Sequence, residues 1–134
     1  FGPCGYGFPS VIGAKIGCPN TPVVGFAVGV GDDMIERSQK CLAAGANLIC
    51  IDVAHGHHTL VRYGLETLRK TFGTSVHIMA GNVATREGYE DLVKWGADSV
   101  RVGIGGGSIC STRIQTGHGV PTLQSIIDWD VNCR

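Results

Sequence analysis

Apolar runs of strand length alternate with amphipathic stretches along this chain. The apolar runs begin near residues 23, 48, 76 and 99. Between them, apolar residues return every three or four positions, which is the spacing of one face of a helix. A glycine closes each of these stretches, at Gly45, Gly73 and Gly96. The unit of strand, helix and glycine recurs three times, which is typical of parallel strands joined by crossover helices.

This pattern sets the expected elements. The predicted strands are residues 23–30, 48–53, 76–80 and 99–104. A helix is predicted after each strand. Polar residues stand where these helices are expected to begin, and we interpret Asp32 or Asp33, Thr85 and Thr122 as N-terminal caps. The chain is therefore predicted to be of the α/β class.

Two architectures fit parallel βα units: a doubly wound sheet and a segment of a TIM (β/α)8 barrel. The predicted strands are apolar almost throughout, as strands covered on both faces require. A closed barrel needs eight units and about 250 residues, so the chain holds about half of one. Against the doubly wound sheet, a Gly-x-Gly-x-x-Gly reading from Gly103 fails at Ser108. The pattern alone leaves both architectures open.

The composition and charge of the chain exclude two classes of binding partner. The 134 residues are 43% hydrophobic and 16% charged, and eleven basic residues balance eleven acidic ones, so we expect no nucleic acid and no membrane as partner. No apolar run approaches the ~20 residues of a membrane span. Residues 1–20 are interpreted as a Gly/Pro-rich lead-in and residues 21–134 as the domain. Four basic residues are interpreted as lying on solvated helix faces: Arg62, Arg69, Lys70 and Arg86.

The six cysteines show neither a Cys-x-x-Cys pair nor a zinc-finger spacing. Cys41 and Cys50 fall on apolar positions of an expected helix and strand, and both are interpreted as buried apolar residues. We therefore expect reduced thiols and a cytoplasmic protein. His55, His57 and His58 lack an acidic partner at metal-binding spacing, so we infer no metal site from them.

A glycine-rich stretch follows the last predicted strand: residues 103–113 read GIGGGSICSTR. Four glycines in five positions leave no side chain between the backbone and a bound group, so N–H groups can face a phosphate, or carbonyls a cation. Cys110 is the predicted nucleophile, because nearby N–H dipoles favour a thiolate. Asp52 and Asn82 stand near the ends of the two preceding strands, where both architectures bind ligands. A ligand site is predicted at this rim.

This stretch resembles the catalytic loop of the inosine monophosphate dehydrogenase and GMP reductase family. Residues 116–121 (TGHGVP) continue the likeness, and residues 52–57 (DVAHGH) and 81–85 (GNVAT) resemble two further family motifs, closest to the bacterial dehydrogenase. The resemblance covers residues 23–126 and implies the barrel segment. The chain departs from the family pattern in three small ways, at His58, Gly106 and Ser111.

The resemblance implies an oxidoreductase that converts IMP, a purine nucleoside monophosphate, to XMP in guanine nucleotide biosynthesis. The cysteine matching Cys110 attacks the purine carbon between the two ring nitrogens, hydride passes to NAD, and water hydrolyses the thioimidate. Thr112 matches a hydroxyl that assists proton transfer beside that cysteine. Ser108 matches a residue that binds the nucleotide's phosphate.

The resemblance also implies how NAD is bound. Asp52 is expected to accept hydrogen bonds from the nicotinamide ribose, a role that acidic residues often play in dinucleotide sites. Gly103, Ile104 and Gly105 are expected to lie against the nicotinamide. Asn82 is expected to contact a ligand or to tie down the glycine-rich loop, and the sequence leaves these two roles open.

A potassium ion is the second implied cofactor, bound by the backbone carbonyls of Gly105, Gly107 and Cys110. Carbonyl oxygens suit such hard cations. A homo-oligomer, a tetramer by resemblance, is expected. Two alternatives stay open: a GMP reductase that uses NADPH, and an incomplete half-barrel that only binds nucleotide or a partner. The family's phosphate-gripping loop and water-activating flap have no match here, so we expect the isolated chain not to be an independent catalyst.

Overall fold

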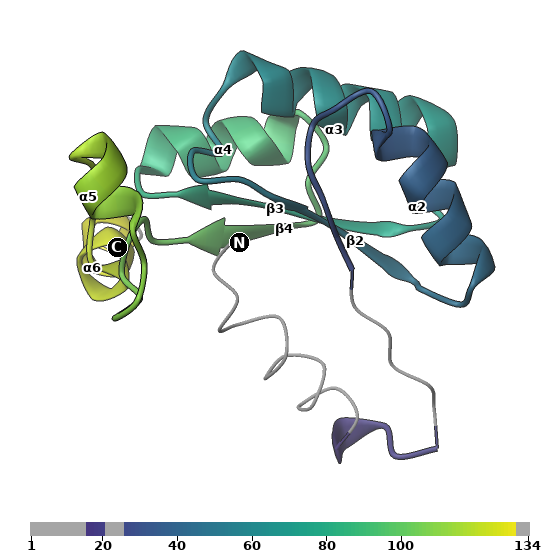
Figure 1. Ribbon diagram of the computed structural model, residues 1–134, viewed down its shortest axis with the longest axis horizontal. Helices are drawn as coiled ribbons and strands as arrows, with labels where there is room; N and C mark the ends of the chain where they lie inside the picture. Colours follow the sequence, from purple (N-terminus) through teal and green to yellow (C-terminus); the bar gives the residue numbers. More distant parts are fainter. Residues whose placement is uncertain (1–15, 21–25, 131–134) are drawn as a thin grey trace.

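The computed structural model describes residues 16–20 and 26–130, which contain a four-stranded sheet with helices between its strands (Figure 1). The strands are β1 (Ala27–Val28), β2 (Leu48–Asp52), β3 (His77–Val83) and β4 (Ser99–Val102). The helices are α2 (Met34–Ala43), α3 (Thr59–Phe72), α4 (Arg86–Lys94), α5 (Thr112–Thr116) and α6 (Thr122–Asp130). The strands pair in the order β1-β2-β3-β4, and every pair is parallel.

All four predicted strands are present, although their ends differ from the prediction. Strand β3 continues to Val83, beyond the predicted end at residue 80, whereas β4 stops at Val102. Within the predicted strand 23–30 only Ala27–Val28 pairs as β1, and residues 23–25 lie outside the described part of the chain. Of the predicted lead-in, residues 1–15 also lie outside it.

The helices follow the apolar pattern, with two wrong caps and one addition. Thr122 is the first residue of α6 and not the residue that precedes it. The Thr85 side chain accepts a hydrogen bond from the N–H of Gly88, which caps α4 as predicted. Asp33 precedes α2, but its carboxylate makes no capping bond and instead pairs with Arg37 at 2.9 Å. Helix α5 was not expected. Its Gly- and Ser-rich surroundings hide so short a helix from an apolar repeat.

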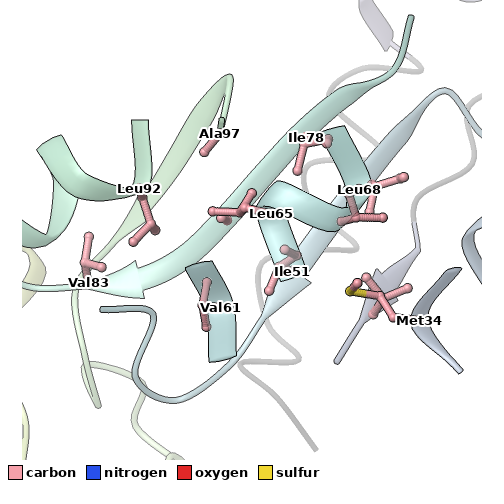
Figure 2. Packing of buried hydrophobic residues seen from close by; sticks show 12 residues of the cluster. Met34, Ile51, Val61, Leu65, Leu68, Ile78, Val83, Leu92 and Ala97 are labelled. Atoms are coloured by element: carbon pink, nitrogen blue, oxygen red, sulfur yellow. The ribbon is translucent and has the colours of Figure 1, made fainter. Parts of the chain in front are cut away.

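The hydrophobic core lies between one face of the sheet and the helices α2, α3 and α4. Alternate residues of β2 and β3 point into it, and Figure 2 shows Leu65 and Leu68 of α3 against Ile51 and Ile78 of these strands. These four side chains are completely buried. Met34 brings α2 into the same cluster, and Leu92 brings α4. Burial of this apolar surface is the main force that packs the helices on the strands.

The other face of the sheet carries half-buried residues, including Cys50, Met79 and Arg101. The expectation that apolar layers cover both faces is therefore not met in the described chain. Helices on a single face, with strands in sequential order, distinguish the two candidate architectures. A doubly wound sheet has helices on both faces, whereas a barrel wall has them only on the outside. The described chain is an α/β segment of the TIM-barrel type.

Arg69 joins α3 to the amino-terminal edge of the sheet, and its interpretation as a solvated residue is wrong. Its guanidinium donates hydrogen bonds to the carbonyls of Gly96 at 2.6 Å, Gly73 at 3.0 Å and Val76 at 3.1 Å. It also pairs with Asp98, and the Arg69 side chain is only 19% exposed. Because these partners belong to the loops around β3 and β4, one side chain fixes two loops to the helix.

Candidate active site

The predicted site residues gather at the carboxyl ends of β2, β3 and β4. Asp52 ends β2 and lies beside Gly81 of β3, which in turn lies beside Arg101 of β4. Asn82 follows Gly81 within β3. The chain then leaves β4 into α5, and Figure 1 shows α5 and α6 next to the tips of β3 and β4. The strand ends therefore place Asp52 and Asn82 at one edge of the sheet, and the glycine-rich loop starts from the same edge after β4.

An ion pair joins two of these strand ends. Oδ2 of Asp52 lies 3.0 Å from Nη1 of Arg101, and both side chains are more than four-fifths buried. The Arg101 side chain reaches Asp52 by crossing Gly81, where an added Cβ would lie 2.7 Å from the Arg101 Cβ. Glycine is therefore needed at this position. Sequence reasoning missed Arg101, although a single cation in an apolar strand was a visible signal.

The thiol of Cys50 lies on the same face of the sheet. Its Sγ is 3.8 Å from Nη1 of Arg101. Burial raises the pKa of Cys50, and the hydrogen bond and positive charge of Arg101 only partly oppose this effect. Cys50 is half-buried and free, as are Cys41 and Cys110, whereas Cys18 is exposed and free. The raised pKa makes Cys50 a poor nucleophile.

Two oxygen atoms at the rim lack a hydrogen-bond partner among the described residues. They are Oδ1 of Asp52 and Oδ1 of Asn82, and both are buried. The Asn82 amide nitrogen is occupied, because it donates to the carbonyl of Gly103 at 2.6 Å. Asn82 thus ties the start of the glycine-rich loop to β3 and still offers an acceptor. Buried acceptors without donors are costly, so a ligand with hydroxyl groups would satisfy them.

The chain between residues 103 and 120 forms a closed excursion from the sheet, which we call the nucleophile loop. An antiparallel bridge between Ile104 and Val120 closes its base. The N–H of Cys110 donates to the carbonyl of Gly107 at 3.1 Å, which makes a tight turn in front of α5. Cys110 is half-buried, whereas Gly107 and Ser108 are exposed. Ser108 is therefore accessible to a phosphate group from solvent.

The structure brings Cys110 and Thr112 together. Sγ of Cys110 lies 3.3 Å from Oγ1 of Thr112. The pKa of Cys110 is lowered, first by the Thr112 hydroxyl, then by the Thr112 backbone N–H, and further by the positive charge of Arg113. A lowered pKa increases the fraction of thiolate, the form that attacks carbon. The pKa of Cys110 is therefore shifted down, whereas the pKa of Cys50 is shifted up, so Cys110 is the more reactive of the two thiols.

Replacing Thr112 with valine tests the origin of this effect. Thr112→Val removes the hydroxyl at nearly constant volume, so the pKa of Cys110 should rise toward its ordinary value. We expect alkylation of Cys110 by iodoacetamide near pH 7 to slow by roughly two- to tenfold. The difference in alkylation rate should vanish at a pH well above the pKa of Cys110, where the thiol is ionised in both the wild type and the variant. Peptide mass spectrometry identifies the alkylated cysteine, and Thr71→Val on α3 is the control. Equal alkylation rates in wild type and Thr112→Val near pH 7 would contradict the role of the Thr112 hydroxyl.

The histidines after β2 make contacts within the fold. Nε2 of His57 lies 3.0 Å from Oδ2 of Asp91 in α4, and the His57 ring stacks against Trp95 with centroids 5.7 Å apart. His57 is the main cause of a lowered Asp91 pKa. His58 accepts a hydrogen bond from the N–H of Leu60 and so caps α3. Both side chains therefore take part in contacts that stabilise the fold.

Comparison with known proteins places this geometry in a family. A family model described as "IMP dehydrogenase / GMP reductase domain" matches residues 18–134. Inosine-5'-monophosphate dehydrogenase of Nitrosopumilus maritimus is 48% identical over 107 residues, 80% of this chain and 22% of that protein. The enzyme of the same name from Rhizobium tropici is 50% identical over 101 residues, 75% of this chain and 20% of that protein. The chain thus spans about a fifth of these relatives' length.

Solved structures give the same result. A GMP reductase from Trypanosoma brucei superposes with a TM-score of 0.76 at 39% identity, covering 82% of this chain and 24% of that one. The same enzyme in complex with guanosine 5'-monophosphate gives 0.74 at 40% identity, covering 78% and 22%. No helix in the described part of our chain is long and apolar enough to cross a membrane. The family model, the relatives and the superposed fold agree: the chain belongs to the IMP dehydrogenase / GMP reductase family.

Proposed function

We propose that this chain carries the nucleophile of an NAD-dependent IMP dehydrogenase, which oxidises IMP to XMP in guanine nucleotide biosynthesis. The observation that carries the proposal is the Cys110 thiol, with its pKa lowered by Thr112, in a glycine-rich loop at the ends of parallel strands. The curated relatives compared above are named as dehydrogenases, at 48% and 50% identity.

In the proposed reaction, the Cys110 thiolate attacks the purine carbon between the two ring nitrogens and forms a carbon–sulfur bond. The hydride on that carbon leaves with its electron pair, which gives a thioimidate. Water then adds to the same carbon, the carbon–sulfur bond breaks, and the thiol leaves as XMP forms. The Thr112 hydroxyl, 3.3 Å from Sγ, is placed to stabilise the thiolate before attack and after release. Ser108 would bind the phosphate.

NAD, when bound, accepts the hydride. The two buried acceptors of Asp52 and Asn82 fit the hydroxyl groups of a ribose, since neither has a donor among the described residues. Arg101 holds the Asp52 carboxylate through its other oxygen. The Asn82 side chain contacts the carbonyl of Gly103, and the backbone from Gly103 to Gly105 would lie against the nicotinamide. Asp52 therefore orients the cofactor and Asn82 joins that position to the nucleophile loop.

We include in this proposal a monovalent cation, potassium, bound beside the nucleophile by the backbone carbonyls of Gly105, Gly107 and Cys110. In this structure the Gly107 carbonyl accepts a hydrogen bond from the Cys110 N–H and lies 3.5 Å from Nη2 of Arg113, so a bound cation would compete with that guanidinium for the carbonyl. We expect turnover in potassium to exceed that in sodium or lithium by about tenfold or more, because carbonyl ligands favour a weakly hydrated cation. Steady-state assays in the three chloride salts measure this preference. Equal rates in potassium, sodium and lithium would rule out a cation site in the proposed mechanism.

GMP reductase is the second candidate, favoured by the superposed structures, which bear that name. The same thiol would attack GMP, ammonia would leave, and NADPH would supply hydride. A third possibility is a half-barrel that binds nucleotide without turnover. The direction of hydride transfer separates the first two, and the absence of transfer in either direction identifies the third.

Covalent labelling tests the proposed function. In an enzyme that contains this chain, 6-chloro-IMP should label Cys110, because the thiolate attacks the electron-poor chloropurine, a carbon–sulfur bond forms and chloride is the leaving group. The adduct identifies the cysteine that lies against the purine. Peptide mass spectrometry should find the adduct on Cys110 and not on Cys41 or Cys50, and IMP should protect against it. The same enzyme is assayed for NADH formed from IMP and for NADPH consumed with GMP. Labelling at Cys41 or Cys50 instead would reject the assignment.

A further inference from the structure

One side chain runs through the middle of the nucleophile loop. Arg113 belongs to α5, and its aliphatic stem passes between the outgoing and returning parts of the loop. A Cβ added to Gly105 would lie 2.7 Å from the Arg113 Cγ, and one added to Gly119 would lie 2.5 Å from the same atom. The stem therefore packs directly on both backbones. Neither contact is possible with a side chain at either glycine.

These two glycines flank the bridge that closes the loop. Gly105 follows Ile104 and Gly119 precedes Val120, and the N–H of Val120 donates to the Ile104 carbonyl at 2.8 Å. Contact between the Arg113 stem and both glycines holds the two chain segments at the spacing of this bridge. Although Arg113 is exposed as a whole, its methylene groups fill space that would otherwise separate the two segments.

The guanidinium end of Arg113 contacts the turn that carries the nucleophile. Nη2 lies 3.5 Å from the Gly107 carbonyl, and the N–H of Cys110 donates to that same carbonyl. Arg113 and Cys110 thus share one acceptor. The positive charge of Arg113 also adds to the lowering of the Cys110 pKa, after the larger effects of Thr112.

We propose that Arg113 is a positioning residue for the nucleophile loop. Its stem holds Gly105 against Gly119, and its guanidinium holds the Gly107 carbonyl that orients Cys110. Its importance for catalysis rests on the function proposed above, whereas its effect on the loop does not. Lysine keeps a long stem and a charge, methionine keeps only the stem, and alanine keeps neither, so three substitutions separate the two contacts.

Hydrogen exchange of the Ile104 and Val120 amides measures the loop without any nucleotide. The wild-type chain is compared with Arg113→Lys, Arg113→Met and Arg113→Ala in choline chloride, where no small cation competes for the Gly107 carbonyl. In Arg113→Ala, protection of both amides should fall by about tenfold or more. Arg113→Lys should restore it to within about threefold, and Arg113→Met should lie between them. Arg37→Ala on α2, which removes an exposed ion pair, should change neither amide.

The inference is overturned if Arg113→Ala leaves protection within about twofold of the wild type, or if all three variants lose it equally. A kinetic measurement adds a second readout. In an enzyme that contains this chain, Arg113→Ala should lower kcat by roughly tenfold or more with little change in KM for NAD, and Arg113→Lys should recover most of kcat. If Arg113→Ala loses amide protection but the enzyme that contains the wild-type chain does not oxidise IMP, the proposed function is rejected and this inference is supported.

Discussion

Replacement of Cys110 by serine is expected to lower kcat for IMP oxidation by at least about a thousandfold. A serine hydroxyl is almost never ionised near neutral pH, so the contact with Thr112 that lowers the thiol pKa cannot supply an attacking anion. Without a covalent bond to the purine carbon, hydride would have to leave from an unactivated ring. The measurement is steady-state formation of NADH by an enzyme that contains this chain.

Cys41→Ser is the matched control, because Cys41 lies on α2, away from the strand ends that carry the proposed site. It should leave kcat within about twofold, since a substitution remote from the site changes few contacts. Binding of IMP to Cys110→Ser, measured by calorimetry, should persist, which separates loss of the nucleophile from loss of the site. A Cys110→Ser enzyme that retained a tenth of the wild-type rate would exclude covalent catalysis by this residue.

Replacement of Arg69 by methionine is expected to reduce the free energy of unfolding by about 2–4 kcal/mol. Methionine preserves much of the stem, but three carbonyl groups and the Asp98 carboxylate lose their common donor. The Arg69 side chain is mostly buried, so water replaces these hydrogen bonds only in part. Urea denaturation of the chain, followed by far-UV circular dichroism, measures the change.

Arg37→Met provides the contrast for this prediction. Arg37 also pairs with a carboxylate, but both partners are about 60% exposed. Exposed pairs contribute little, so the loss should be below about 0.5 kcal/mol. If the two variants were destabilised equally, the contacts of Arg69 would have no special role, and the loops around β3 and β4 would be held by core packing alone.

The apolar pattern predicted the fold because burial dominates where each strand and helix forms. Ile51, Leu65 and Ile78 lie in the core because their spacing matches a strand or a helix. The end of β3 escaped prediction, since Gly81 and Asn82 normally indicate a turn. Their place within a strand comes from the pairing of Gly81 with Asp52 of β2 and Arg101 of β4, both distant in sequence. No local rule contains that information.

The candidate site was predictable in its chemistry and less so in its contacts. The glycines and the cysteine of residues 103–113 predict a nucleophile at Cys110, and the structure places the Thr112 hydroxyl 3.3 Å from that thiol. The ion pair of Asp52 with Arg101 joins positions 49 residues apart, so it appears only once the strands are aligned. The packing of Arg113 on Gly119 likewise depends on how the loop returns.

The Arg101 side chain also has a consequence for how the chain avoids misfolding. Because the Arg101 side chain crosses β3 to reach Asp52, the ion pair forms only when β4 has the correct register relative to β2. A slip of β4 by two residues would keep the same side chains on each face, so apolar packing alone would tolerate it. Such a slip would place Ser99 or Gly103 beside Gly81 in place of Arg101 and leave the buried Asp52 carboxylate without its cation, which is strongly unfavourable. The ion pair therefore discriminates against a misaligned sheet that hydrophobic burial would accept.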